Sequence, residues 1–221
     1  MNIPAGLLPP AWYWVSDLVL AVLLWDVARN APWRRLSQSS HLNVWLGTVV
    51  VLSVLWTIRT GILPGLGFHL LGATAAQLVF GPRLAIAAMV LVVGSQVATG
   101  AITLQALGLN ALVMGVYPVW ISYAILRLTE RRLPPHLFIY IFAAAFFGAA
   151  FTMVATGALA AGLLSMAQVY RLEYLWTEYL PWFVLMAWAE AFSTGAALTL
   201  MVVYRPTWVS TFDDRRYLGR G

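Results

Sequence analysis

Apolar runs alternate along this chain with short stretches that hold most of its charged and turn-forming residues. A helix needs about 20 predominantly apolar residues to cross a bilayer, and seven runs approach or exceed this length. They cover residues 11–28, 42–60, 62–80, 84–104, 107–128, 136–165 and 178–204. The pattern predicts an all-α, polytopic membrane helix bundle with seven transmembrane helices, in which residues 1–221 form a single integral membrane domain.

The third run is the weakest predictor of a helix. It is short and contains Pro64, Gly65, Gly67 and Gly72, and both residue types interrupt helices. We expect this segment to be broken or tilted, a form that a membrane tolerates only where protein or a cavity shields the backbone. A bundle of six helices is the alternative.

The arginines predict the orientation, because cytoplasmic loops of membrane proteins collect positive charge. All 13 basic residues of the chain are arginines. Those that follow the first, third, fifth and seventh runs are Arg29, Arg34, Arg35, Arg83, Arg127, Arg131, Arg132, Arg205, Arg215, Arg216 and Arg220. Only Arg59 and Arg171 fall on the other side. This bias predicts an N-terminus outside, a cytoplasmic tail at residues 205–221, and an odd number of spans.

The composition supports a membrane protein and excludes several kinds of site. Hydrophobic residues make up 62% of the chain and charged residues 10%, which is far from the composition of soluble domains and implies a lipid bilayer as the surroundings. The net charge of +5 lies in short loops, so we expect no nucleic-acid partner. The chain has no cysteine, which excludes disulfides, thiolate metal sites and cysteine nucleophiles.

The first residues, MNIPAGLLPPAWYW, are unusual for the start of a membrane protein. They lack the basic region of a signal peptide, and Pro4, Pro9 and Pro10 restrict the backbone. Because Asn2 is too large for efficient removal of the initiator methionine, we expect Met1 to remain. Its free α-amine, with a pKa of about 8, would then be available as a metal ligand. The alternative is an ordinary extracytoplasmic tail.

Polar residues inside the apolar runs are candidates for a functional site. His69 lies about eight residues into the third run, roughly 12 Å of helical rise below its outer end. Asp17 and Asn110 also fall in the outer half, and Glu190 falls near the midplane. Together they could form a solute site that is open to the outside. The alternative for His69 is a structural hydrogen bond to a neighbouring helix.

Four stretches carry a resemblance to a known family. MNIPAGLL, PGLGFHLLGATAAQLVFGP, LGLNALVMGV and AEAFSTG, in this order, resemble the substrate-binding membrane subunits (permeases) of energy-coupling factor ABC transporters for cobalt and nickel. The resemblance spans nearly the whole chain. It implies that residues 1–10 fold into the bundle, that the protein lies in a bacterial-type inner (cell) membrane, and that it works with a transmembrane coupling subunit and cytoplasmic ATPase subunits.

The resemblance also implies a metal site. In the family, the terminal amine, the backbone nitrogen and side chain of residue 2, and a histidine in the third span hold the ion, which assigns Met1, Asn2 and His69 as metal ligands with Asn110 in support. Asn2 replaces the histidine that the family has at this position, so an amide takes the place of an imidazole. The transported ion would be a divalent transition metal, Co, Ni, Cu or Zn, and we expect no permanently bound cofactor.

Two other functions are weighed against this one. A proton-coupled secondary transporter of a small solute would use Asp17, Asp26 or Glu190 as a relay and would need no ATPase partner. An intramembrane enzyme would need a nucleophile with a base at the same depth, but no histidine lies at the depth of Ser95. The chain also lacks the Gly-x-x-x-x-Gly-Lys-Ser/Thr pattern of ATPases. We therefore predict a transporter subunit that is not an enzyme.

Overall fold

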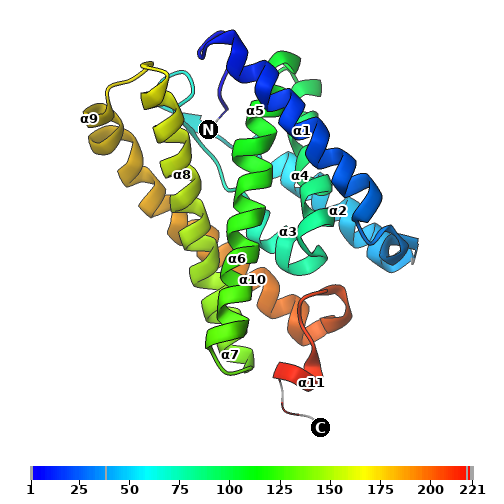
Figure 1. Ribbon diagram of the computed structural model, residues 1–221. Coiled ribbons are helices and arrows are strands. Elements are labelled where there is room, and N and C mark those ends of the chain that lie inside the picture. Colours follow the sequence, from blue (N-terminus) through cyan, green and yellow to red (C-terminus); the bar gives the residue numbers. More distant parts are fainter. Residues whose placement is uncertain (1, 38, 218, 220–221) are drawn as a thin grey trace.

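The computed structural model describes residues 2–37, 39–217 and 219, and these residues are mostly helical (Figure 1). Four of their helices are long and apolar enough to cross a membrane, namely Pro10–Asn30, Leu104–Arg132, Leu137–Met166 and Leu172–Tyr204. Two shorter apolar helices are α2 (Ser39–Leu55) and α4 (Pro82–Ala98). A membrane-embedded helical fold is thus confirmed. The number of crossings and the orientation stay predictions.

Three of the long helices are continuous but combine α-helical segments with π-helical ones, and in one case with a 3-10 segment. The second consists of η2 (Leu104–Ala106), α5 (Leu107–Ala111), the π-helical η3 (Leu112–Val116) and α6 (Tyr117–Arg132). The third consists of α7 (Leu137–Ile139), the π-helical η4 (Tyr140–Phe147) and α8 (Gly148–Met166). The fourth consists of α9 (Leu172–Tyr174), the π-helical η5 (Leu175–Tyr179) and α10 (Leu180–Tyr204). The first is α1 (Pro10–Asn30) alone.

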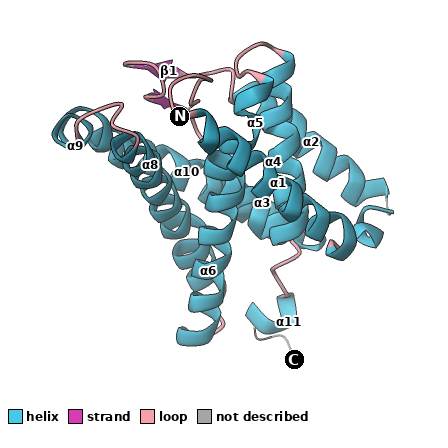
Figure 2. Ribbon diagram, turned by 45° about the horizontal axis from the view of Figure 1, so that its top comes forward, coloured by secondary structure: helices cyan, strands magenta, loops and turns pink. Residues whose placement is uncertain are grey.

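The apolar run at 62–80 does not form one helix. Residues Thr60–Gly61 (β1) and Gly67–Phe68 (β2) pair as a short antiparallel hairpin, an extended stretch follows, and only Ala73–Phe80 (α3) is helical (Figure 2). The physical reason lies in the glycines, because Gly65 and Gly72 adopt left-handed φ values of 82° and 67°. Such a backbone cannot continue a right-handed helix. The expectation of a broken span is therefore correct, and a continuous third helix is excluded.

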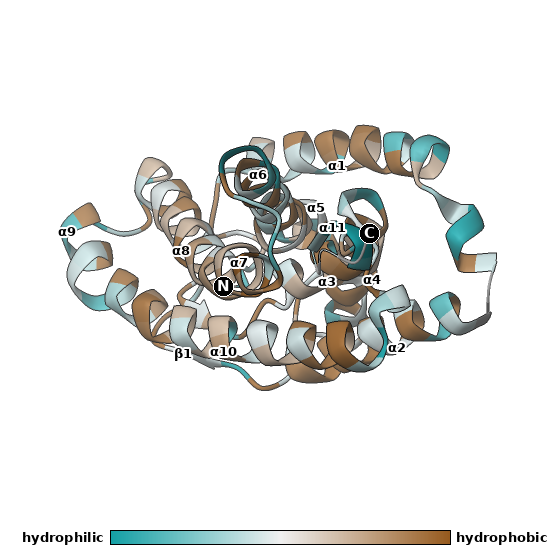
Figure 3. Cartoon of the chain, turned by 90° about the horizontal axis from the view of Figure 1, so that it is seen from below, coloured by the Kyte–Doolittle hydropathy of each residue, from teal (hydrophilic) through white to brown (hydrophobic). Residues whose placement is uncertain are grey.

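The helices surround α3, the helical part of this segment. Seen along the bundle, α3, α4 and α5 lie between α1 on one side and α2 on the other (Figure 3), while α3 also packs against α6 and α10. Large apolar side chains remain exposed on the outer faces of the long helices, including Leu18, Val22, Phe151, Leu185 and Phe192. In a soluble protein such a surface would be a liability. In a bilayer it is the face that contacts lipid.

The described residues that follow α10 up to Tyr217 are docked against the bundle. After α10 come η6 (Pro206–Trp208) and α11 (Asp214–Tyr217). The backbone N–H of Ser210 donates to the carbonyl of Val79 at 2.8 Å, and the hydroxyl of Thr211 donates to the carbonyl of Leu78 at 2.6 Å. These bonds satisfy carbonyls at the C-terminal end of α3, which a helix leaves without intrahelical partners. The segment predicted as a tail therefore fixes the end of α3.

Candidate functional site

The described N-terminal residues are held inside the bundle by Asn110 of α5. Its side-chain amide pairs with both backbone groups of Ile3: Oδ1 accepts from the N–H at 2.8 Å, and Nδ2 donates to the C=O at 2.9 Å. Nδ2 also donates to the carbonyl of Ala106 at 2.8 Å. Ile3 and Asn110 are both fully buried. An amide can make this two-way bond because it carries a donor and an acceptor side by side.

Tyr13 of α1 holds the next turn of the N-terminal segment. Its hydroxyl donates to the carbonyl of Pro4 at 2.7 Å and accepts from the N–H of Leu8 at 3.1 Å. On the other side, Leu7 lies so close to Gly65 that a Cβ at Gly65 would meet the Leu7 side chain at 2.8 Å. Asn110 and Tyr13 thus fix the residues that follow Asn2 from two different helices, and the loop of the hairpin packs against them.

Asn2 lies beside the hairpin at a cleft of about 340 Å³. The lining residues are Asn2, Pro4, Arg59, Thr60, Gly61, Leu63, Pro64, Gly65, Gly67 and Ala101. The side chain of Asn2 is partly buried, and its Oδ1 is buried without a hydrogen-bond partner. A buried amide oxygen without a partner costs about 1–3 kcal/mol, so it marks a position where a ligand would be favourable.

His69 follows β2 directly and is 2% exposed. Its Nδ1 lies 3.0 Å from the carbonyl oxygen of Leu70. Because a carbonyl only accepts, Nδ1 carries the proton, and Nε2 of the neutral ring then has a free lone pair. Nε2 is buried without a hydrogen-bond partner. The ring packs on Trp56 with centroids 4.4 Å apart. This is the protonation pattern of a histidine that binds a metal through Nε2.

Glu190 of α10 contacts the segment just after His69. Its carboxylate accepts from the N–H groups of Leu71 and Gly72, at 2.8 and 2.7 Å. The indole N–H of Trp56, which follows the end of α2, donates to the carbonyl of Leu71 at 3.2 Å. The backbone between β2 and α3 is therefore held from two helices.

Asp17 contacts α5 rather than the hairpin. Its carboxylate accepts from the N–H of Gly108 at 3.1 Å, and a Cβ at Gly108 would overlap Asp17. The acid therefore supports the helix that carries Asn110. Asp26, at the other end of α1, pairs with Arg83 at 3.1 Å and accepts a hydrogen bond from Asn30.

The structure brings several of the predicted residues into one region. Asn2 lines the cleft beside the hairpin and His69 follows its second strand, while Asn110 fixes the residue after Asn2 and Glu190 fixes the residues after His69. Met1 lies outside the described residues. Within the described ranges, no group of three or more His, Cys, Asp and Glu side chains is placed to hold a metal ion. A site here would thus depend on amide and amine groups as well as the histidine.

Sequence reasoning missed Trp56 and Tyr13 as parts of this region. Tyr13 belongs to an aromatic cluster next to Trp12 and Trp14, which is typical of residues at a membrane interface. Trp56 sits at the end of an apolar run, where an aromatic residue has the same ordinary explanation. No sequence signal separates these two side chains from lipid-facing ones, although both are 1% exposed.

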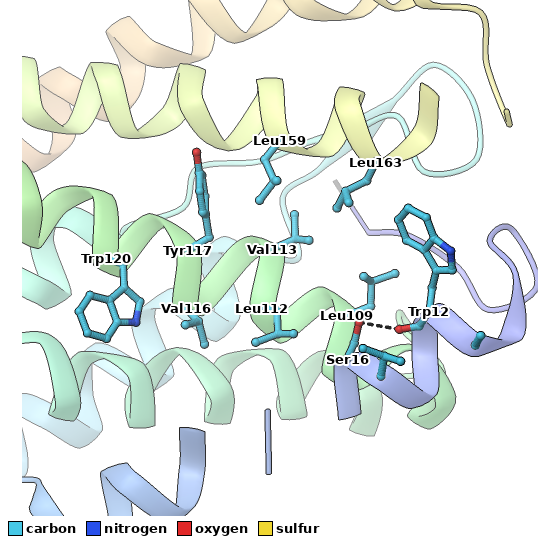
Figure 4. A pocket seen from close by; sticks show the side chains of 12 residues that line it. Trp12, Ser16, Leu109, Leu112, Val113, Val116, Tyr117, Trp120, Leu159 and Leu163 are labelled. Carbon is cyan, nitrogen blue, oxygen red and sulfur yellow. Dashed lines mark hydrogen bonds between the residues drawn. The ribbon is translucent and has the colours of Figure 1, made fainter. Parts of the chain in front are cut away.

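A larger cavity lies elsewhere and has a different character. It has a volume of about 690 Å³ and lies between α1, the helix through α5 and α6, and α8 (Figure 4). Leucine and valine side chains such as Leu112, Val113 and Leu159 point into it, and the hydroxyl of Ser16 is already bonded to the carbonyl of Trp12. An apolar groove of this kind suits hydrocarbon rather than a metal ion.

Comparisons with known proteins concern the family and the fold. Residues 2–208 match the family CbiM, described as the cobalt uptake substrate-specific transmembrane region. The fold is similar to that of a crystallised transition metal transporter, which is 20% identical and aligns over 100% of both chains with a TM-score of 0.77. A truncated transition metal transporter is 18% identical over 92% of this chain and 99% of its own, with a TM-score of 0.75. No curated protein matches the chain. At these identities the structural likeness concerns the fold.

Proposed function

The chain belongs to the CbiM family of cobalt-uptake transmembrane proteins, and from this premise we propose that it is the substrate-capturing subunit of an energy-coupling factor ABC-type importer. In this proposal it binds a divalent transition-metal ion of the cobalt and nickel class at the outer face of a bacterial-type inner membrane. Seven spans, an outer N-terminus and a cytoplasmic C-terminus are part of the same proposal.

One observation carries the proposal. Asn2 Oδ1 and His69 Nε2 are both buried without a hydrogen-bond partner; Asn2 lines the cleft beside the hairpin, and His69 directly follows the second strand of the hairpin. Each unpaired group costs about 1–3 kcal/mol. A cation that coordinates them would remove this cost, whereas a purely structural role would leave both groups unsatisfied.

The proposed ligands are His69 through Nε2, the side chain and backbone nitrogen of Asn2, and the α-amine of Met1. Nitrogen ligands suit Co(II), Ni(II), Cu(II) and Zn(II). The amide of Asn2 is a weaker ligand than an imidazole, so we expect lower affinity than a histidine at this position would give. Asn110 supports the site by fixing Ile3 on both sides.

Partners are also part of the proposal. The chain lacks an ATPase phosphate-binding motif, so ATP hydrolysis would take place in cytoplasmic ATPase subunits, linked through a transmembrane coupling subunit. The transported ion is the substrate, and the protein itself is not an enzyme.

The contacts of the acids favour proton-coupled transport, the rival function, less than metal capture. A relay residue must exchange protons with mobile neighbours. Asp17, Asp26 and Glu190 instead accept bonds from the Gly108 amide, from Arg83, and from the amides of Leu71 and Gly72. Each carboxylate therefore has structural partners.

The experiment that tests the proposal measures the metal content of purified protein by mass spectrometry after loading with Co²⁺, Ni²⁺, Cu²⁺ and Zn²⁺ separately. We compare the wild type with His69→Ala and with a variant that has one extra residue before Asn2, which displaces the amine. His136→Ala is the matched control, because His136 is exposed at the start of α7. Metal that is retained after His69→Ala would refute the proposed site.

A further inference from the structure

Glu190 is a carboxylate inside an apolar helix, and its partners are backbone amides. It is 2% exposed, and its two oxygens each accept from one of two consecutive backbone amides, those of Leu71 and Gly72. A carboxylate accepts two bonds side by side. One side chain therefore fixes both the position and the direction of this stretch of backbone.

Trp56, which follows the end of α2, holds the same stretch from another element. Its indole N–H donates to the carbonyl of Leu71 at 3.2 Å, so Leu71 is bonded through its N–H to α10 and through its C=O to the residue after α2. The Trp56 ring also packs on the His69 imidazole, with an interplanar angle of 48°. Trp56 thus contacts both the ring and the backbone that carries it.

Gly72 makes the arrangement possible. Its φ of 67° turns the chain from the extended stretch into α3, and a Cβ at this position would overlap the side chain of Leu52. The turn presents the Gly72 amide to Glu190. With α10 on one side and α2 on the other, the backbone at 70–72 has little freedom.

We infer that Glu190 and Trp56 are positioning residues of the metal site: they fix the backbone at Leu71–Gly72 and the plane of the imidazole, and so keep Nε2 of His69 available to the ion. The inference rests on the proposed function, because His69 is a ligand only there. It gives Glu190 a role other than carrying protons. It also explains how this helix accommodates a buried acid that has no basic partner among the described residues, since two amide bonds stabilise its carboxylate.

The test uses full-length protein in detergent and Co²⁺ alone as the probe. The variants are Glu190→Gln, which keeps one acceptor oxygen, Glu190→Leu, which keeps none, and Trp56→Phe, which keeps a ring but loses the indole N–H. Glu178→Gln is the control for loss of an acid from the same long helix, at an exposed position. Trp45→Phe is the control for loss of a buried indole bond, because the indole of Trp45 donates to the carbonyl of Leu84.

Three readouts are compared. The first is the Co²⁺ dissociation constant, which we expect to rise about 10- to 100-fold in the positioning variants, more in Glu190→Leu than in Glu190→Gln. The second is the visible absorption spectrum of bound Co²⁺, which should change because the histidine is reoriented. The third is hydrogen exchange at Leu71 and Gly72, which should become faster in the Glu190 variants without metal present. Both controls should match the wild type.

The inference would be overturned if Trp56→Phe and a folded Glu190 variant both bound Co²⁺ with unchanged affinity and an unchanged spectrum. Unchanged hydrogen exchange at Leu71 and Gly72 in the folded Glu190 variant would also overturn it. If Glu190→Leu does not fold, Glu190→Gln and Trp56→Phe decide the question. A lower melting temperature with wild-type affinity and spectrum would mean a merely structural role, and so also counts against it. Wild-type protein that binds none of Co²⁺, Ni²⁺, Cu²⁺ and Zn²⁺ would refute the proposed function instead, and the exchange data would still report whether Glu190 holds this backbone.

Discussion

Replacing Asn110 by Ala removes three hydrogen bonds at once, two of them to Ile3 and one to Ala106. Because Ile3 is fully buried, water cannot replace the lost partners while the N-terminal segment stays in place. Its N–H and C=O would both be left unpaired, at about 1–3 kcal/mol each. The substitution should therefore cost the docked N-terminal segment about 2–6 kcal/mol.

This cost can appear either as a loss of stability or as a loss of metal affinity. If the segment stays docked, the free energy of unfolding falls by the full amount. If it leaves the bundle, only the docked fraction can bind the ion, and the apparent affinity falls in proportion to that fraction. For a loss of about 2 kcal/mol, binding weakens by at most roughly 30-fold, since each 1.4 kcal/mol is about tenfold and the docked fraction cannot fall by more than the docking equilibrium does. We therefore expect a clear loss of Co²⁺ affinity in Asn110→Ala.

The assay is a Co²⁺ titration with a competing chelator, together with thermal unfolding of the same samples. Gln96→Leu is the matched control: Gln96 is also a buried amide, and it donates to the carbonyl of Ser53 rather than to the N-terminal segment. It should lose stability but keep Co²⁺ affinity. Wild-type affinity and wild-type melting temperature in Asn110→Ala would show that Asn110 does not hold the N-terminal segment.

Two further substitutions test the site from other directions. Gly72→Ala should lower the free energy of unfolding by about 1–3 kcal/mol, because an L-residue is strained at a φ of 67° and its Cβ would displace Leu52. Thermal unfolding compares this variant with the control Gly94→Ala, where a Cβ meets open space. Equal melting temperatures of the two variants would contradict the prediction. Asn2→His should tighten Ni²⁺ or Co²⁺ binding by about tenfold or more, because an imidazole replaces an amide as ligand. Competition with a chelator measures the dissociation constant. Weaker binding than in the wild type would show that Asn2 does not face the ion.

Much of the helical frame could be predicted from the apolar runs. The runs at 11–28, 107–128 and 136–165 correspond to helices Pro10–Asn30, Leu104–Arg132 and Leu137–Met166, since a long apolar stretch has few other stable forms in a bilayer. The run at 62–80 shows the limit of the method. Apolar character alone does not separate a buried extended strand from a helix, and only the glycines and Pro64 indicated a break.

The partners of the polar residues could not be predicted. Glu190 was expected at mid-depth as a supporting or relay residue, but its partners are backbone amides of a segment 118 and 119 positions earlier in the chain. Every residue except proline has such an amide, so the sequence carries no sign of which one is used. The same holds for Thr211, whose bond to the carbonyl of Leu78 makes an expected tail part of the fold.

The two halves of the proposed site are held by separate sets of contacts. Asn110 and Tyr13 hold the N-terminal segment from α5 and α1, while Glu190 and Trp56 hold the stretch after His69 from α10 and the end of α2. Contact between the halves runs through the hairpin, where Leu7 meets Gly65. An ion that binds Asn2 and His69 together would link two parts that otherwise touch mainly through side-chain packing. Metal binding should therefore stabilise the docking of the N-terminal segment against the hairpin more than it stabilises the segment or the hairpin alone.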